Sequence, residues 1–485
     1  MIRPDCETIQ KLAKNYSIIP VCKEIYADVI TPITLLQKLA AISNRYYLLE
    51  SIEGGEKWAR FSFLGFDPVM RLVCKDGIVT ISEGNTVKSV KTQKPLDVVR
   101  EVMSEFNAPS LPGMPPFTGG LVGYFGYAMI EYFEPVLKLK RGGCDFDLML
   151  FDKVIAYDHL KQKICIVVNM KADRVMENYG KAVSEIEHIV RLIYDKQPLP
   201  RLRAQANMEF TCNISKDDYC KAVERTREYI IDGDIFQAVI SRRFESEYHG
   251  SLINAYRVLR TTNPSPYMVY MHFDNLELIS ASPETLVRLQ KGRLATFPAA
   301  GSRPRGATDE EDRALEAELL TDEKELSEHN MLVDLARNDL GRISKIGSVE
   351  VMDYMMIHRY SRIMHIASRV ESDIRPDCDA LSAVEAILPA GTLSGAPKIR
   401  ACEIIDELEH GPRGIYGGAL GYVDFSGNLD TCIAIRMAVK EGGRVYVQAG
   451  SGIVADSVPN TEYEESGNKA RAVIDAILRA GEVDE

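Results

Sequence analysis

The stretch "RVYVQAGSGIVADSVPNTEYEESGNKARA", residues 444–472, decides between two classes of fold. It contains Gly450-x-Gly452-x-x-Ala455, a weak match to the glycine fingerprint of dinucleotide-binding folds. That fingerprint requires a helix that opens at the glycines, whereas the helical pattern here begins only after Pro459. The stretch is therefore predicted to be a strand, a connection and a helix outside any doubly wound fold.

Other segments of the chain favour an antiparallel sheet. Short apolar segments have the composition of strands, and they do not alternate regularly with helical patterns. Examples are "YYLLES", "VMRLVC", "GIVTIS", "KICIVVNM" and "IFQAVISRRF", while "PLDVVREVMSEF", "YGKAVSEIEHIVRLIYD" and the segment after Ser215 are helical patterns. Because strict alternation is absent, the predicted class is α+β with an antiparallel sheet.

The chain has 485 residues, enough for two domains or for one large interleaved domain. The best candidate boundary is "DKQPLPRLRAQANMEFTC", which contains two prolines and little periodicity. The predicted division is residues 1–195, a linker over 196–212, and residues 213–485. No internal repeat is found.

Composition excludes several classes of protein. A net charge of −12 argues against a nucleic-acid-binding surface, and no run approaches the ~20 apolar residues that span a membrane. The start, "MIRPDCETIQ", lacks the apolar core of a signal peptide. The ten cysteines are scattered without a CxxC pair, so reduced thiols and a cytoplasmic location are predicted.

The helix after Pro459 carries an unusual group of charges. At 3.6 residues per turn, Glu462, Glu465 and Lys469 share a face with Val473, which belongs to the apolar side. Both carboxylates are therefore expected to point towards protein, where they need a compensating partner. The partner could be an ordinary ion pair, a metal or a substrate, and this stretch alone leaves the three open.

Two helix starts contribute further carboxylates. Thr461 and Glu464 have the spacing of a capping box, and Asp322 is a predicted N-cap. In the helix after Asp322, Glu328 shares the apolar stripe with Leu332. An isolated glutamate there is more often part of a buried ion pair. Together with the inward-facing glutamates, however, it makes a site for a hard cation such as Mg²⁺ competitive.

Three segments rich in small residues are predicted to be turns whose backbone N–H groups can bind anions: "PAAGSRPRG" (298–306), "PAGTLSGAPKIRA" (389–401) and "AGSG" (449–452). The nearby cations are Arg303, Arg305, Lys398 and Arg436. Each segment alone is more often just a turn, but with paired carboxylates they suggest a small substrate with several carboxylates. His365, in a strand-like run, is either a core residue or a general acid/base.

The motifs, taken in order, resemble the chorismate-utilising enzymes over nearly all of residues 213–480. The motifs are "GDIFQAVISRRF", "NPSPYM", "SASPETLV", "PAAGSRPRG", "DEKELSEHNMLVDLARNDLGRI", "MHIASRV", "PAGTLSGAPKIRA", "GIYGGALGY", "DTCIAIRMA", "QAGSGIV" and "E..GNKA". The segment "LLES", residues 48–51, resembles the tryptophan-binding motif of the anthranilate synthase branch of this family.

This resemblance implies an antiparallel-sheet sandwich flanked by helices and assigns roles to residues. Glu328 and Glu465 are implied to bind Mg²⁺, and Glu462 is implied to support these ligands without binding the metal itself. Glu284 is implied to protonate the departing 4-hydroxyl of chorismate, and His365, with Thr392 nearby, to assist elimination of pyruvate. The implied substrate contacts are Gly301, Ser302, Tyr416, Arg436, Gly450, Ser451, Gly452 and Lys469.

Two positions distinguish the reactions of the family. Isochorismate and salicylate synthases activate water with a lysine where this chain has Gln237, and an amide cannot act as that base. Aminodeoxychorismate synthases typically carry a nucleophilic lysine where this chain has Ala300. The resemblance therefore implies direct attack of ammonia on ring carbon 2, which is the anthranilate route.

Three alternatives stay open at this level: a lysine-free aminodeoxychorismate synthase, an enzyme that stops at aminodeoxyisochorismate, and a non-catalytic tryptophan-sensing subunit. The last is disfavoured because Glu284, Glu328, His365 and Glu465 are all present. The chain departs from the usual family pattern at Ser302, where threonine is common, and at Ser466-Gly467, where glycine loosens a helix by roughly 1 kcal/mol relative to alanine.

The resemblance also implies partners and control. No Gly-x-Cys-x-Gly nucleophile elbow is present, so ammonia is expected from a separate glutamine amidotransferase subunit in a hetero-oligomer. Residues 1–195 are expected to be regulatory and residues 213–485 catalytic. Tryptophan is expected to inhibit by binding at Ser51 with Pro266, Tyr267 and Met268, and Glu50 could meet its ammonium group.

Overall fold

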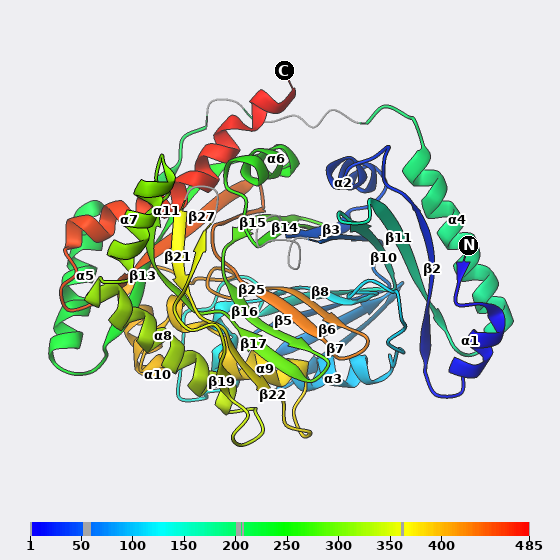
Figure 1. Cartoon of the computed structure of the whole chain (residues 1–485), viewed down its shortest axis with the longest axis horizontal. Helices are drawn as coiled ribbons and strands as arrows, with labels where there is room; N and C mark the ends of the chain where they lie inside the picture. The colour runs from blue at the N-terminus through cyan, green and yellow to red at the C-terminus, as the bar shows by residue number, and fades with distance from the viewer. Residues whose placement is uncertain (1, 52–59, 200–204, 206–207, 360–362, 485) are drawn as a thin grey trace.

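The computed structural model describes residues 2–51, 60–199, 205, 208–359 and 363–484, without the side chains of Ser302, Ile363 and Asp484. Two large antiparallel sheets face each other as a sandwich, and helices cover the outer faces (Figure 1). The predicted α+β class with an antiparallel sandwich is therefore confirmed.

The first sheet has 13 strands within the described residues, all paired antiparallel. In spatial order they are β1 (Ile2–Arg3), β2 (Ile18–Tyr26), β11 (Lys163–Lys171), β10 (Lys153–Asp158), β4 (Phe61–Phe66), β3 (Arg45–Glu50), β14 (Tyr267–Phe273), β15 (Leu276–Ser282), β26 (Met437–Glu441), β27 (Arg444–Ile453), β13 (Gln237–Glu247) and β12 (Thr211–Cys212), with β23 (Gly395–Ala396) also paired to β13.

The second sheet and a small third sheet complete the strands of the described chain. The second runs β19 (Glu350–Val351), β22 (Val370–Asp373), β17 (Arg293–Thr296), β16 (Thr285–Gln290), β25 (Leu429–Ile433), β24 (Ala419–Asp424), β8 (Gly120–Phe125), β9 (Phe146–Phe151), β5 (Met70–Lys75), β6 (Ile78–Glu83) and β7 (Thr86–Lys91). The third is β18 (Ala299–Pro304), β21 (Ile363–Ala367) and β20 (Met356–Arg359).

The helices lie mainly outside the sheets. They are α1 (Cys6–Leu12), α2 (Pro32–Ala40), α3 (Pro95–Ser104), α4 (Val175–Tyr194), α5 (Lys216–Ile231), α6 (Ile253–Thr262), α7 (Asp309–Leu319), α8 (Glu323–Gly341), α9 (Ala380–Ile387), α10 (Lys398–Leu408) and α11 (Pro459–Leu478), with 3-10 turns η1 (Tyr127–Tyr132), η2 (Gly391–Leu393) and η3 (Arg479–Asp484). None of the helices in the described residues has the length and apolarity needed to cross a membrane.

Both halves of the chain contribute strands to both large sheets. In the first sheet β3 pairs with β14, with Leu49 opposite Val269. In the second, β8 pairs with β24, with Gly123 opposite Gly421. The predicted boundary at 196–212 therefore separates two parts of one interleaved sandwich. The division into a regulatory and a catalytic part stays a prediction.

Apolar side chains fill three layers of this sandwich. The layer between the sheets includes Tyr47, Phe63, Met149, Val269 and Met271. A second layer lies between the first sheet and α2, α4, α6 and α11, and a third lies between the second sheet and α3, α8 and α9. Strand β8 is buried along its whole length because it lies in the middle of the second sheet.

The helix starts agree with the sequence in one case and differ in another. Asp322 caps α8 by accepting hydrogen bonds from the N–H groups of Lys324 and Glu325, as predicted. Helix α11 instead begins at Pro459, with Val458 as an N-cap that makes no side-chain hydrogen bond. The capping box predicted for Thr461 and Glu464 is therefore wrong: proline, preorganised for the first helical position, moves the N-cap three residues earlier, from Thr461 to Val458.

Candidate functional site

The centre of the candidate site is the paired end of β13 and β27. Residues 449–452 were expected to form a turn, but they belong to β27, with Gly452 opposite Val239 and Gly450 opposite Ser241. The side chain of Gln237 is buried against Gly452, where an added Cβ would lie 2.7 Å from the Gln237 amide nitrogen. The Gln237 amide oxygen is buried and has no hydrogen-bond partner in the described part of the chain.

Ser451 faces away from Gly450 and Gly452, as alternation along a strand requires. Its hydroxyl lies 3.1 Å from the Tyr219 hydroxyl and donates to the backbone carbonyl of Glu462 at 3.3 Å. The hydroxyl is therefore used between β27 and α11, and only the backbone of Ser451 is left for the predicted substrate contact. The Gly450 carbonyl accepts a hydrogen bond from Lys469 Nζ at 3.3 Å.

Helix α11 presents its two candidate carboxylates differently. Glu462 is buried, with 8% of its surface exposed, as predicted. The side chain of Glu465 is 46% exposed and pairs with Lys469, with Nζ and Oε1 2.7 Å apart. The inward orientation predicted for Glu465 is therefore wrong. At 100° per residue it lies about 80° round the helix from Val473, so it reaches the edge of the packed face.

Helix α8 brings a third carboxylate towards the same region. Burial raises the pKa of Glu328, the carboxylates of Glu325 and Glu465 raise it further, and Lys324 and Lys469 lower it. Repulsion among carboxylates marks a donor set that fits a hard divalent cation, which takes oxygen ligands. Within the described residues no group of three or more His, Cys, Asp or Glu side chains could hold a metal, so protein carboxylates could supply only part of a coordination shell.

Glu284 lies between Ser282 and β16. Thr392 Oγ1, in η2, donates a hydrogen bond to Glu284 Oε2 at 3.0 Å. Burial raises the pKa of Glu284, while the hydrogen bond from Thr392 and the charges of Arg436 and Lys469 lower it. Four predicted residues from distant segments therefore meet here, and the raised pKa suits a proton donor.

His365 lies in β21, as its strand-like surroundings predicted. Its Nδ1 is 3.1 Å from the backbone carbonyl of Gly301, so Nδ1 carries the proton and donates. Burial is the main cause that lowers the pKa of His365, and Arg436 lowers it further. The imidazole is therefore neutral at neutral pH. Ser302 lies opposite His365 in the β18–β21 register, and its side chain lies outside the described atoms.

The cations expected near the small-residue segments mostly have other partners. Residues 299–304 form strand β18 rather than a loop. Arg303 pairs with Glu318 and Asp322, Arg305 with Asp312, and Lys398 with Asp339. These three cations join the α7, α8 and α10 regions, and their role in binding anions stays a prediction. Arg436 and Lys469 are the cations within electrostatic reach of Glu284.

A cavity with a volume of about 1240 Å³ lies between the two sheets. Its walls include Ser51, Pro266, Tyr267 and Met268, so the predicted tryptophan-binding residues gather at one cavity. The cavity also reaches Pro283 and Thr285, the residues on either side of Glu284. Tyr267 crosses the space, and its hydroxyl donates to Asp430 Oδ1 at 2.8 Å.

Glu50 lines the same cavity and already has three partners within the protein. It is buried and accepts hydrogen bonds from Ser62 Oγ at 2.9 Å, Tyr256 OH at 2.8 Å and Arg260 Nε at 2.9 Å. Tyr256 and Arg260 belong to α6, so the carboxylate faces the outer side of the first sheet. Met268 is opposite Glu50 and packs in the same outer layer. Glu50 and Met268 nevertheless line the cavity, so the contact of Glu50 with an ammonium group stays a prediction.

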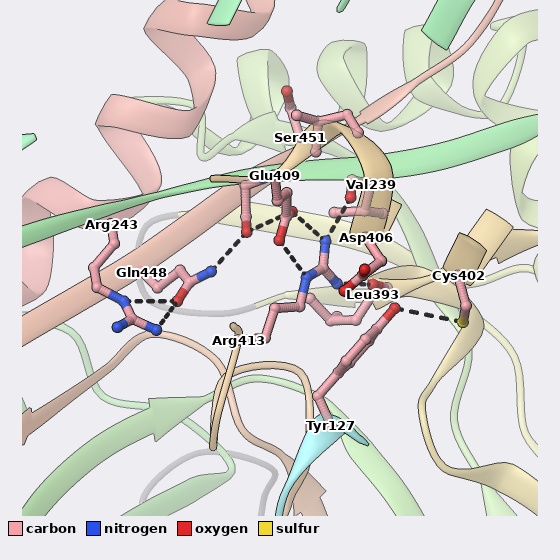
Figure 2. Close-up of polar contacts among 12 residues, drawn as sticks. Tyr127, Val239, Arg243, Leu393, Cys402, Asp406, Glu409, Arg413, Gln448 and Ser451 are labelled. Carbon is pink, nitrogen blue, oxygen red and sulfur yellow. Dashed lines mark hydrogen bonds and ion pairs between the residues drawn. The ribbon is translucent and has the colours of Figure 1, made fainter. Parts of the chain in front are cut away.

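Sequence analysis missed one buried group beside the site. Arg413 and Glu409 form an ion pair with 2.6 Å between Arg413 Nη2 and Glu409 Oε1, and both side chains are buried (Figure 2). The sequence signal was the spacing of four residues between Glu409 and Arg413. That signal is weak, because in most proteins such a pair lies on an exposed helix.

The chain belongs to the family of chorismate binding enzymes, whose model matches residues 45–475. It is 47% identical to "Anthranilate synthase component 1" of Acetivibrio thermocellus, with 100% of both chains covered. It is 45% identical to the protein of the same name from Aquifex aeolicus, with 99% of this chain and 98% of the relative covered. The structure resembles the crystal structure of anthranilate synthase component I from Streptococcus pneumoniae TIGR4, with a TM-score of 0.78, 35% identity, and coverage of 93% of this chain and 98% of that one.

Proposed function

We propose that this protein is the large subunit of an anthranilate synthase. It would convert chorismate and ammonia into anthranilate, pyruvate and water. The proposal is supported by the family, by relatives of the same name matched over their whole length, and by the convergence of Glu284, Thr392, Arg436 and Lys469.

One observation carries the choice of nucleophile. The two positions that hold an amine in related reactions are occupied by Gln237 and Ala300, and both side chains are buried. Gln237 cannot remove a proton from water, but its unpartnered amide oxygen can accept a hydrogen bond from ammonia. Ala300 cannot form a covalent bond to the ring. Ammonia is therefore the nucleophile that this site accommodates.

The residues divide the chemistry into two steps. Ammonia attacks ring carbon 2 while Glu284 gives its proton to the departing 4-hydroxyl, which leaves as water. The ring then loses the proton on carbon 2 as the bond between ring carbon 3 and the ether oxygen breaks, and the released enolpyruvate takes up a proton on its methylene carbon and leaves as pyruvate. His365, neutral and fixed through its Nδ1–H, assists this second transfer.

Mg²⁺ is the metal that we assign to the carboxylates. Glu328 and Glu465 would hold it, and Glu462 would orient its shell from the buried side of α11. When bound, a hard cation supplies positive charge for the ring carboxylate of chorismate. Lys469 lies 2.7 Å from Glu465 and would balance part of the negative charge of this site.

The remaining substrate contacts come from strand ends and from one turn. The carboxylate oxygens of the substrate would accept hydrogen bonds from backbone N–H groups, namely those of Gly450, Ser451 and Gly452 and those of Gly301 and Ser302. Arg436 and Lys469 would supply positive charge. Tyr416 is buried beside Glu284, and burial raises the pKa of its phenol, so it would donate as a neutral hydroxyl.

Two partners follow from the same proposal. An amidotransferase subunit would supply ammonia from glutamine, because a component 1 implies a second component. Tryptophan would bind in the cavity at Ser51, Pro266, Tyr267 and Met268 and lower the affinity for chorismate. Contact of the same cavity with Pro283 and Thr285 gives such a ligand a route to the backbone of Glu284.

Product identification tests the proposal. The protein is incubated with chorismate, ammonium ions and Mg²⁺, and the products are separated and weighed by mass spectrometry. Equal amounts of ortho-aminobenzoate and pyruvate support it. A para-amino product that keeps the enolpyruvyl group, accumulation of aminodeoxyisochorismate, or no turnover would each refute it.

A further inference from the structure

We infer that the buried Glu409–Arg413 pair is a positioning device that holds Thr392 against Glu284. Neither residue touches the reacting groups. Arg413 Nη1 donates to the backbone carbonyl of Leu393, the neighbour of Thr392, and Nη2 donates to the carbonyl of Val239 at 2.6 Å (Figure 2). One guanidinium therefore joins η2, which carries Thr392, to β13, which begins with Gln237.

A second set of contacts closes the same junction. The Val239 N–H donates to the Ser394 carbonyl at 2.9 Å, so η2 and β13 are linked from both sides of Val239. Gly395 permits this approach, because a Cβ there would lie only 2.0 Å from the Gln237 carbonyl. The guanidinium is the charged component of a tight backbone contact, and lysine cannot reproduce its planar set of donors.

Glu409 fixes the guanidinium in turn. Its carboxylate binds Arg413 through two hydrogen bonds, Nε to Oε2 at 2.9 Å and Nη2 to Oε1 at 2.6 Å. Ser241 donates to Oε1 with both its N–H and its hydroxyl, each at 2.7 Å. Arg413 also lies over the ring of Tyr416, 5.6 Å from its centroid. Three site residues on three segments, Thr392, Gln237 and Tyr416, therefore depend on one ion pair.

Simple stabilisation is a poor explanation for this pair. A buried ion pair is often no more stabilising than packed apolar side chains, because both charges lose their hydration. Its value here lies in the partners of Arg413, which are the carbonyls of the segments that carry the site. A displacement of about 1 Å in such a segment can reduce turnover about a hundredfold.

The inference rests on the proposed function, because turnover to anthranilate is its readout. Arg413→Lys and Thr392→Val are made singly and together, with Arg71→Lys as control. Arg71 is also half of a bidentate pair, with Asp147, and contacts none of the site residues. We expect Arg413→Lys to lower kcat about a hundredfold with little change in KM, and Arg71→Lys to leave kcat unchanged.

The double variant and the pH profile separate positioning from general weakening. The combined loss in kcat should be clearly smaller than the product of the two single losses, because either change breaks the Thr392–Glu284 contact. Both single variants should shift the alkaline limb of the kcat profile to higher pH. Multiplicative losses, an unchanged limb in Arg413→Lys, or an equal loss in Arg71→Lys would overturn the inference.

Two further results keep the outcome decisive. If Arg413→Lys fails to fold, Glu409→Gln replaces it in the cycle, since the amide keeps the size and one acceptor for Ser241 while it removes the charge. Parent protein without anthranilate production would refute the proposed function rather than the positioning role. That role would then be judged from chemical-shift changes at Thr392 in Arg413→Lys, and unchanged shifts would refute it.

Discussion

Two ion pairs in this protein have the same spacing in the chain and nearly the same length, yet they lie in opposite surroundings. Lys469 and Glu465 are 2.7 Å apart with side chains 40% and 46% exposed. Arg413 and Glu409 are 2.6 Å apart with side chains 2% and 5% exposed. An exposed pair gains little from its contact and exchanges partners easily. A buried pair holds its partners in place.

The difference assigns separate tasks to the two regions. At the edge of α11 lies the exposed Glu465 carboxylate, which we propose binds a cation. At the junction of η2 and β13, the buried Glu409–Arg413 pair cannot separate without leaving buried polar groups unpaired. An active site needs both, because ligands must enter at one side while the reacting groups are held fixed from the other.

The largest expected effect comes from placing a charge on the buried face of α8. Leu332 is buried one turn after the partly buried Glu328. Leu332→Asp buries a carboxylate without a partner and should cost more than about 4 kcal/mol of unfolding free energy. Glu328→Gln should unfold like the parent in urea followed by circular dichroism. Equal stability of the parent and Leu332→Asp would show that this face of α8 is accessible to solvent.

The next effect should appear in one step only. His365→Met should slow pyruvate elimination by about 10²–10⁴-fold, because a positioned proton-transfer group contributes that much. Amination uses Glu284 and should continue, so aminodeoxyisochorismate should accumulate in a chromatographic time course. If both steps slowed equally, His365 would be a structural residue of β21.

A smaller effect concerns the pH profile of Glu284. Thr392→Val removes the hydrogen bond that lowers the pKa of Glu284, so that pKa rises further above its usual range. Because the protonated acid is the active form, kcat falls as pH rises through this pKa. The fall should therefore move to higher pH in the variant, whereas Thr431→Val, in the second sheet, should leave it in place. A shift to lower pH would remove Glu284 as the acid.

The smallest effect on turnover is expected in the cavity between the sheets. Ser51→Phe fills space at the wall formed with Pro266 and Met268, without touching Glu284 or α11. Turnover at saturating chorismate should stay at the parent value, while inhibition by added tryptophan is lost. Unchanged sensitivity in the variant, or an insensitive parent, would end the assignment of this cavity to tryptophan.

The sequence predicted the fold class, the strand with His365 and the Asp322 cap, because each follows from local periodicity and from hydrogen-bonding side chains. The burial and the partners of a side chain were harder to predict where they depend on neighbouring segments. Glu465 shares a helical face with Val473, but the width of the packed face decides its exposure. Arg303 and Lys398 lie in segments with the composition of anion-binding turns, yet each forms an ion pair with a carboxylate of a neighbouring helix. Glu409 and Arg413 carry no local sign of burial.

Titration with Mg²⁺ is the most direct test of the proposed assignment of this metal to Glu328 and Glu465, of which Glu465 belongs to the exposed pair on α11. Turnover of chorismate with ammonium is measured against Mg²⁺ concentration for the parent, Glu465→Gln, and Glu464→Gln, whose parent glutamate lies exposed beside Glu465. Glu465→Gln should lose about a thousandfold, because several kcal/mol of charge stabilisation disappear. Glu464→Gln should follow the parent curve. Near-parent turnover of Glu465→Gln at ordinary Mg²⁺ would contradict the account.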